Sequence, residues 1–329
     1  MTQRSALSPQ LLNLIRFTEE SLDTEIILHR QADCPPCGIL VDTYTYETGK
    51  NVIVYPTAFL GLLKNFVIAL NVTKLLIRGT TYKSGHYEVL SYEPDGIAIG
   101  MEQIYLDLLK DARTRELSLS RKKKIPFYLY KLFHDTLSEI PWGILSHTFL
   151  AIHLPVMRSA QLYFLIRESL RDMHELVEVK DYIPRRYFAM HNGMFYARDM
   201  ILASILSEYK LNPLINIPEL QRFRNLDIKE MMTHRWSQSH WYHTKMVGDA
   251  MYDMLRQELP PPRADQWNPS DLGQVYHHGQ TITDHFIALM QMSGWYIWDS
   301  PAHLLSAELH QAEIERIAFT RIFGDQTEV

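Results

Sequence analysis

The chain has 329 residues, of which 46% are hydrophobic and 22% are charged, and its formal net charge is −5. These are the values of a globular protein with about two domains, and the net charge argues against a surface built as a whole to grip nucleic acid or an anionic membrane. Its two cysteines lie in one tetrapeptide, which excludes a fold held together by a disulfide framework.

The N-terminal segment MTQRSALSPQLLNLIRFTEE lacks the basic stretch, long apolar run and small-residue cleavage site of a signal peptide. The most apolar window, residues 58–77, contains Lys64 and Lys74. It therefore falls short of the ~20 nearly uncharged residues that a bilayer requires. We expect a cytoplasmic protein with no membrane span.

The first hundred residues predict a small sheet. Ser8 and Pro9 predict the start of a short helix, with Ser8 as N-cap and Pro9 at the first helical position. Brief β-branched and aromatic runs then alternate with Gly, Pro, Asn and Asp, which predicts strands. The runs are EIILHR, GILVDTYTY, NVIVYP, KLLIRG, HYEVLSY and GIAIG. One helix is expected among them, at residues 58–70.

Beyond about residue 101, apolar residues recur at spacings of three and four, which predicts helices. The expected helices include 156–177, 184–209, 227–255 and 300–324, and the Pro-rich stretch 259–273 predicts a long loop. The sequence therefore predicts a helix-dominated α+β fold. A small sheet-containing portion, residues 1–100, is followed by a bundle-like helical portion, residues 101–329.

Both cysteines belong to DCPPCG, residues 33–38. A thioredoxin-like Cys-x-x-Cys follows a strand and opens a helix, whereas this pair precedes a predicted strand, which disfavours a redox site. CPxCG resembles the knuckle of zinc-ribbon and rubredoxin-like sites. The resemblance implies a structural zinc ion held by Cys34, Cys37 and two further ligands, with His29 the nearest candidate and His86 the next. The alternative is a structural turn with two reduced thiols.

Two Arg/His pairs in the helical portion have the Arg-x4-6-His spacing of ribonucleases of the HEPN class. The pairs are Arg235 with His240 and Arg186 with His191. In that class the imidazole acts as acid or base and the Arg stabilises developing phosphate charge. Tyr or Trp follows the Arg here, where those enzymes often have a small polar residue. The first hypothesis is therefore an intracellular phosphoester hydrolase acting on RNA or a nucleotide.

Two other functions stay open. One is a non-enzymatic binding or assembly protein, in which the zinc knuckle stiffens the N-terminal portion and the helices present a surface to a protein partner. The other is a metal-dependent helical enzyme, because helical spacing turns several C-terminal histidines toward the apolar faces. These histidines are His240, His243, His278, His285 and His310.

Two short motifs add to these hypotheses. The doublet His134-Asp135 resembles the metal-binding pair of HD-domain phosphohydrolases. The basic run 121–124 predicts a solvated loop at the border of the two portions, or a contact with phosphates.

Overall fold

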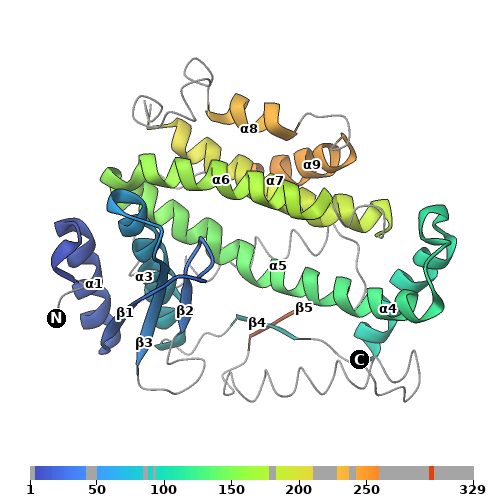
Figure 1. The fold of residues 1–329 in the computed structure, drawn as a ribbon, viewed down its shortest axis with the longest axis horizontal. Helices are drawn as coiled ribbons and strands as arrows, with labels where there is room; N and C mark the ends of the chain where they lie inside the picture. The colour runs from blue at the N-terminus through green and yellow to red at the C-terminus, as the bar shows by residue number, and fades with distance from the viewer. Residues whose placement is uncertain are drawn as a thin grey trace.

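The computed structural model describes residues 4–41, 50–83, 88–91, 94–177, 183–209, 228–236, 242–258 and 296–299. In these ranges the fold consists mainly of long helices, with a three-stranded sheet near the N-terminus and a separate two-stranded sheet (Figure 1). The predicted class, a helix-dominated α+β fold with a small N-terminal sheet, is confirmed.

The first helix, α1 (Pro9–Leu22), begins where its capping residues predict. The Ser8 hydroxyl accepts a hydrogen bond from the backbone N–H of Leu11 at 3.3 Å, and Asp23 ends the helix in the left-handed conformation, with φ of 52°. Leu11 and Ile15 are fully buried, and α1 packs on α3 (Gly61–Lys83).

Three of the predicted strands form one sheet. Its order is β1 (Ile26–Gln31), β3 (Asn51–Pro56) and β2 (Ile39–Val41), with β1 parallel and β2 antiparallel to β3. A second sheet pairs β4 (Glu88–Ser91) antiparallel with β5 (Tyr296–Asp299). The second sheet pairs the strand that precedes α4 (Pro94–Lys110) with the last described segment of the chain.

Two predicted strands are helical instead. KLLIRG, residues 74–79, continues α3, and GIAIG, residues 96–100, lies in α4 (Pro94–Lys110). The prediction failed for α3 because this helix packs against α1, β3, α5 and α6, so residues around its whole circumference are buried. A helix that is apolar all round lacks the one-sided spacing by which helices are recognised.

The helical portion contains five further described helices. They are α5 (Leu119–His153), α6 (Arg158–Val177), α7 (Arg185–Ser207), α8 (Ile228–Trp236) and α9 (Tyr242–Glu258). Short 3-10 turns lie at Arg4–Ala6, Ala112–Thr114 and Pro155–Met157. The range predicted as one helix, 227–255, covers α8 and all of α9 except its last residues, since α9 ends at Glu258. The predicted loop 259–273 and helix 300–324 lie outside the described residues.

The basic run 121–124 is not a loop. It lies in the first turns of α5, where the Ser118 hydroxyl accepts a hydrogen bond from the backbone N–H of Arg121 at 3.3 Å. The serine cap satisfies a backbone N–H that the helix itself leaves unpaired, which favours helix over loop at this point.

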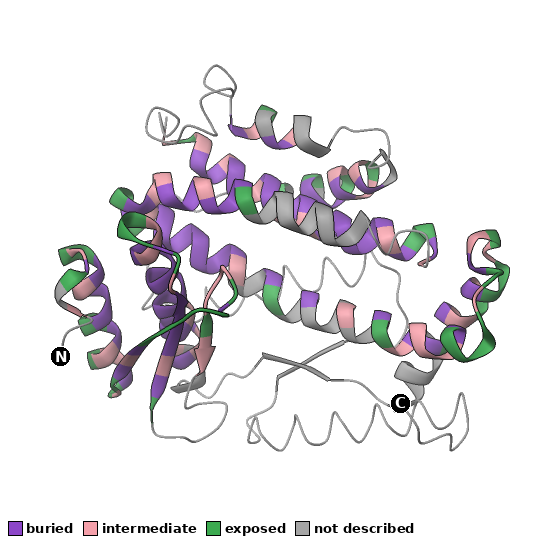
Figure 2. Ribbon diagram, viewed as in Figure 1, coloured by how far each residue is buried: buried purple, intermediate pink, exposed green. Residues whose placement is uncertain are grey.

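The described residues form two hydrophobic cores (Figure 2). The N-terminal core gathers α1, α3 and the β1–β3 sheet, and the helical core gathers α4 and α7 to α9. Helices α5 and α6 belong to both cores. Phe149 of α5 and Phe164 of α6 lie in the N-terminal core. Ile144 of α5 and Ile166 of α6 lie in the helical core. The two portions are therefore joined by shared helices.

Among the described helices, none is by itself long and apolar enough to cross a bilayer. By length and composition alone, the bent pair Gly143–His153 and Pro155–Arg167, with an angle of 113° between its members, would pass as a broken span.

Candidate functional site

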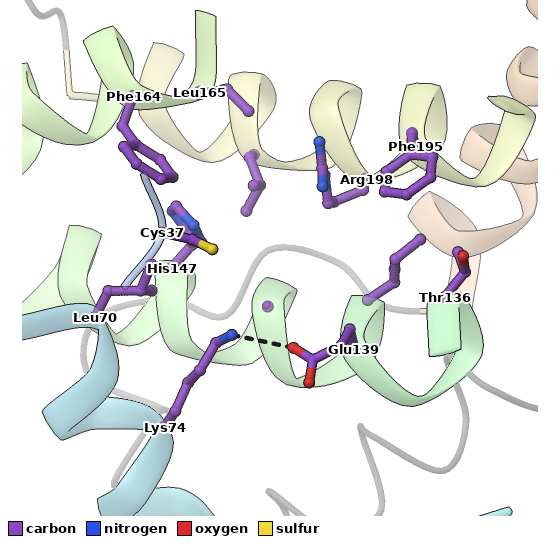
Figure 3. Close-up of a pocket in the computed structure, with 13 residues that line it drawn as sticks. Cys37, Leu70, Lys74, Thr136, Glu139, His147, Phe164, Leu165, Phe195 and Arg198 are labelled. Carbon is purple, nitrogen blue, oxygen red and sulfur yellow. Dashed lines mark hydrogen bonds and ion pairs between the residues drawn. The ribbon is translucent and has the colours of Figure 1, made fainter. Parts of the chain in front are cut away.

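A cavity of about 310 Å³ lies where α3, α5, α6 and α7 meet the CPPCG turn (Figure 3). The cavity lies between the N-terminal portion and the helical portion. Its apolar wall consists of Leu70, Ile140, Phe164, Leu165, Phe195 and Leu202. Its polar wall consists of Cys37, Lys74, Thr136, Glu139, His147 and Arg198, and Gly143 completes the lining.

Cys37 reaches the cavity because the turn that carries it is tightly anchored. Gly38 has φ of 75°, which L side chains rarely adopt, and its N–H donates to the Pro35 carbonyl at 2.9 Å. The side-chain amide of Asn71, on α3, donates to the Cys37 carbonyl at 2.9 Å. A Cβ added at Gly38 would lie 2.7 Å from that amide nitrogen, so the close approach of turn to helix requires glycine.

The second thiol of the turn points into the protein. Cys34 is 8% exposed and its Sγ donates to the Val54 carbonyl at 3.4 Å. Burial, and secondarily the neighbouring Cys37, raise the pKa of the Cys34 thiol. No disulfide joins the two cysteines in this structure.

His147 is a buried, neutral imidazole in the cavity wall. The Gln161 side-chain amide lies 3.2 Å from its Nδ1 and donates to its backbone carbonyl at 2.8 Å. An amide donor on Nδ1 leaves the ring proton on Nε2. Burial, with smaller contributions from the Arg198 and Lys74 charges, lowers the pKa of His147 to about 3.

Two cationic side chains line the cavity, and their ion-pair partners differ. Lys74 Nζ lies 3.1 Å from Glu139 Oε2, and this cation holds the pKa of the Glu139 carboxyl below its usual range. Arg198 donates through Nε at 2.9 Å and through Nη2 at 2.7 Å to one oxygen of Asp199, a fully buried carboxylate. Its guanidinium also lies 4.9 Å from the centre of the Phe195 ring.

Thr136 connects the cavity to a second buried histidine. Its hydroxyl donates to the Leu132 carbonyl at 2.7 Å and lies 3.0 Å from His191 Nε2. Because the single hydroxyl proton goes to Leu132, the proton of the second bond belongs to His191 Nε2. Burial lowers the pKa of His191 to about 4, so the ring is neutral at pH 7.

Gly143 leaves part of the cavity open. A Cβ built on this residue would meet no heavy atom of the described chain within 4 Å. Glycine inside a helix is less favourable than alanine by about 1 kcal/mol. The middle of α5 therefore carries a residue that weakens the helix and leaves room beside it.

The structure separates the members of the predicted pair Arg186 and His191. Arg186 is exposed at the start of α7, with its guanidinium 5.9 Å from the ring of Tyr187, whereas His191 is 5% exposed and faces Thr136. Five residues along a helix place two side chains about 140° apart around the axis, which agrees with one exposed and one buried position.

The other predicted catalytic pair is not tested. Arg235 lies in α8, but its side chain is not described, and His240 lies outside the described residues. The same holds for the C-terminal histidine cluster: the side chain of His243, in α9, is not described, and His278, His285 and His310 lie outside the described ranges. The side chains of His134 and Asp135 are not described either. These hypotheses stay predictions.

The zinc hypothesis also stays a prediction. Cys34 and Cys37 lie in the turn between β1 and β2, and His29 is exposed on β1. Within the described residues, no group of three or more His, Cys, Asp or Glu side chains is placed to hold a metal ion. A four-ligand site on this turn would need ligands from the rest of the chain, where His86 lies.

Several cavity residues carry signals in the sequence that no catalytic or metal-binding motif contains. Arg198 and Asp199 interrupt the apolar helix α7, and a charged pair inside an apolar helix indicates a buried ion pair or a site. Lys74 stands in the most apolar stretch of the chain, and Gly143 stands inside a long helix. Their convergence depends on how α3, α5 and α7 pack, which no local pattern encodes.

No known protein family, curated protein or solved structure matches this chain. The function is therefore argued from the residues of the cavity.

Proposed function

We propose that this protein binds a small organic molecule in the cavity between its two portions. The observation that carries the proposal is a lining in which six apolar side chains face two cations, with open space beside Gly143. Sites for small molecules are mostly apolar, contain a few polar groups that orient the ligand, and have volumes of about 300–1,000 Å³. A volume of about 310 Å³ suits a ligand of two or three aromatic rings.

Binding is better supported than acid–base catalysis at this place. A general acid or base works best when its pKa lies near the working pH. The pKa of His147 is about 3 and that of His191 about 4, so both rings stay neutral and poorly basic at pH 7. Their hydrogen bonds to Gln161 and Thr136 suit residues that shape and orient a site.

The test uses N-phenyl-1-naphthylamine, a neutral fluorophore with one phenyl ring and one naphthalene ring system, which brightens in apolar surroundings. The unmodified protein should bind this probe, and Gly143→Leu, which places an isobutyl group in the open space, should weaken binding by at least tenfold. Gly143→Ala is the matched control, because a methyl group occupies little of the cavity, and it should bind within about twofold of the unmodified protein. Equal affinity of the Leu and Ala variants for the probe would refute the proposal.

A further inference from the structure

The two ion pairs of the cavity differ in how firmly each cation is held. Arg198 has a fully buried carboxylate, Asp199, as its partner and packs on the Phe195 ring, so its position is fixed. Lys74 is 22% exposed at its side chain, whereas its partner Glu139 is 68% exposed. The cation is therefore the inner member of this second pair, and the carboxylate is its more exposed member. Figure 3 shows the pair in the cavity wall.

An exposed carboxylate is easily displaced from such a pair. Ion pairs with an exposed member contribute little to stability, because water solvates the separated charge nearly as well as the partner does. If Glu139 turns toward solvent, it keeps its hydration and loses only the contact with Lys74. Lys74, more deeply placed, would then require another acceptor.

The cavity lining carries two cations, Lys74 and Arg198, and one carboxylate, Glu139, which is the more exposed member of its ion pair. Both cations disfavour a positive charge on His147. The apolar residues Phe164, Leu165 and Leu202 line the same space. An apolar chamber with two cations in its wall, one of them paired only with an exposed carboxylate, favours a molecule that combines a hydrophobic body with an acidic group.

We propose that the ligand is a small organic anion whose acidic group displaces Glu139 from Lys74, while its hydrophobic body lies against the apolar wall. The inference rests on the proposed function and adds to it the chemical class of the ligand. In the empty cavity the Glu139 carboxylate pairs with Lys74, and in the complex the acidic group of the ligand takes its place. Carboxylates, sulfonates and phosphates share this chemistry.

The experiment compares two probes that differ by one acidic group. N-phenyl-1-naphthylamine is neutral, and 8-anilinonaphthalene-1-sulfonate has the same rings with a sulfonate. Glu139→Gln removes the competing carboxylate and should tighten sulfonate binding about three- to fivefold, and Lys74→Gln should weaken it by a similar factor. Neither variant should change the affinity for the neutral probe by more than about twofold, since the apolar wall is intact.

The control for Glu139→Gln is Glu102→Gln, which removes the same charge from an exposed position on α4. It should leave both affinities unchanged, and a gain equal to that of Glu139→Gln would show that net charge alone is responsible. Melting temperatures of all variants establish that each is folded. The Gly143→Leu variant should lose both probes.

The outcomes separate this inference from the proposed function. If both probes bind and Gly143→Leu removes them, but neither Glu139→Gln nor Lys74→Gln alters sulfonate affinity, the cavity binds ligands without using Lys74 and the anion inference is wrong. If Gly143→Leu affects neither probe, the proposed function itself fails.

Discussion

At the level of single residues, the two buried histidines make the free energy of unfolding depend on pH. Burial alone lowers the pKa of His191 from 6.5 to about 4, and His147 is lowered to about 3 by burial, Arg198 and Lys74. In the unfolded chain both rings would titrate near 6.5. Between these values the unfolded chain binds protons that the folded protein does not, so stability is full above pH 6.5 and falls as the pH drops toward 4.

Replacing His191 by Gln should reduce this pH dependence. At pH 5 the unfavourable protonation of one such ring amounts to about 2 kcal/mol relative to pH 8. The measurement is the free energy of unfolding in urea at pH 8 and at pH 5. Its decrease from pH 8 to pH 5 should be about 2 kcal/mol smaller in His191→Gln than in the unmodified protein. His29→Gln, at an exposed position, is the control and should leave the difference unchanged. An equal difference in all three proteins would contradict the neutral, buried state of His191.

At the level of elements, three glycines inside helices have contrasting surroundings. Gly248, in α9, faces α7 so closely that an added Cβ would overlap the ring of Tyr196. Gly193, in α7, approaches α9 in the same way, with the Val247 side chain 3.0 Å from the position of an added Cβ. Gly143 in α5 has open space instead. The first two glycines allow α7 and α9 to pack closely, and the third leaves room in the cavity.

Alanine at these positions should therefore act in opposite directions. Gly248→Ala should lower the free energy of unfolding by about 1–3 kcal/mol, because the methyl group forces α7 and α9 apart. Gly143→Ala should raise it by about 0.5–1 kcal/mol, because alanine favours the helix and meets no neighbour. Chemical denaturation of the two variants in one buffer measures both effects. Destabilisation by Gly143→Ala would mean that the space beside α5 is filled.

At the level of the whole molecule, the N-terminal core depends on helices that come later in the chain. Besides α1, α3 and the sheet, this core contains residues of α5 and α6. They are Leu145, Phe149, Leu150, Ala160 and Phe164, and Leu154 joins them from the connection between the two helices. Without these side chains, one face of α3 would be exposed to water. The fold of the first hundred residues therefore requires the helical portion.

A fragment of residues 1–100 should not fold alone. Its amide resonances should cluster as in an unfolded chain, and they should disperse when residues 101–329 are co-expressed and the two fragments associate, because α5 and α6 then cover α3. A dispersed spectrum of the isolated fragment would show instead that the boundary predicted near residue 100 separates two independent domains.

The features predicted correctly from sequence are those that neighbouring residues determine. Ser8 and Pro9 specify the start of α1, and NVIVYP specifies β3, because capping and β-branched runs act locally. KLLIRG was misread because its burial comes from four separate elements. Only Cys37 of the cavity was among the predicted site residues, since the meeting of Lys74, His147 and Arg198 depends on the packing of three helices.

The position of Cys37 makes its thiol a chemical reporter of whether the cavity is occupied. The chain has only two thiols, and Cys34 is buried with its Sγ bonded to the Val54 carbonyl, whereas Cys37 is partly exposed and lines the cavity. A small alkylating reagent should therefore react first at Cys37, and a bound ligand should slow that reaction. The rate of alkylation then measures occupancy directly, so unknown mixtures can be screened for the natural ligand before its identity is known.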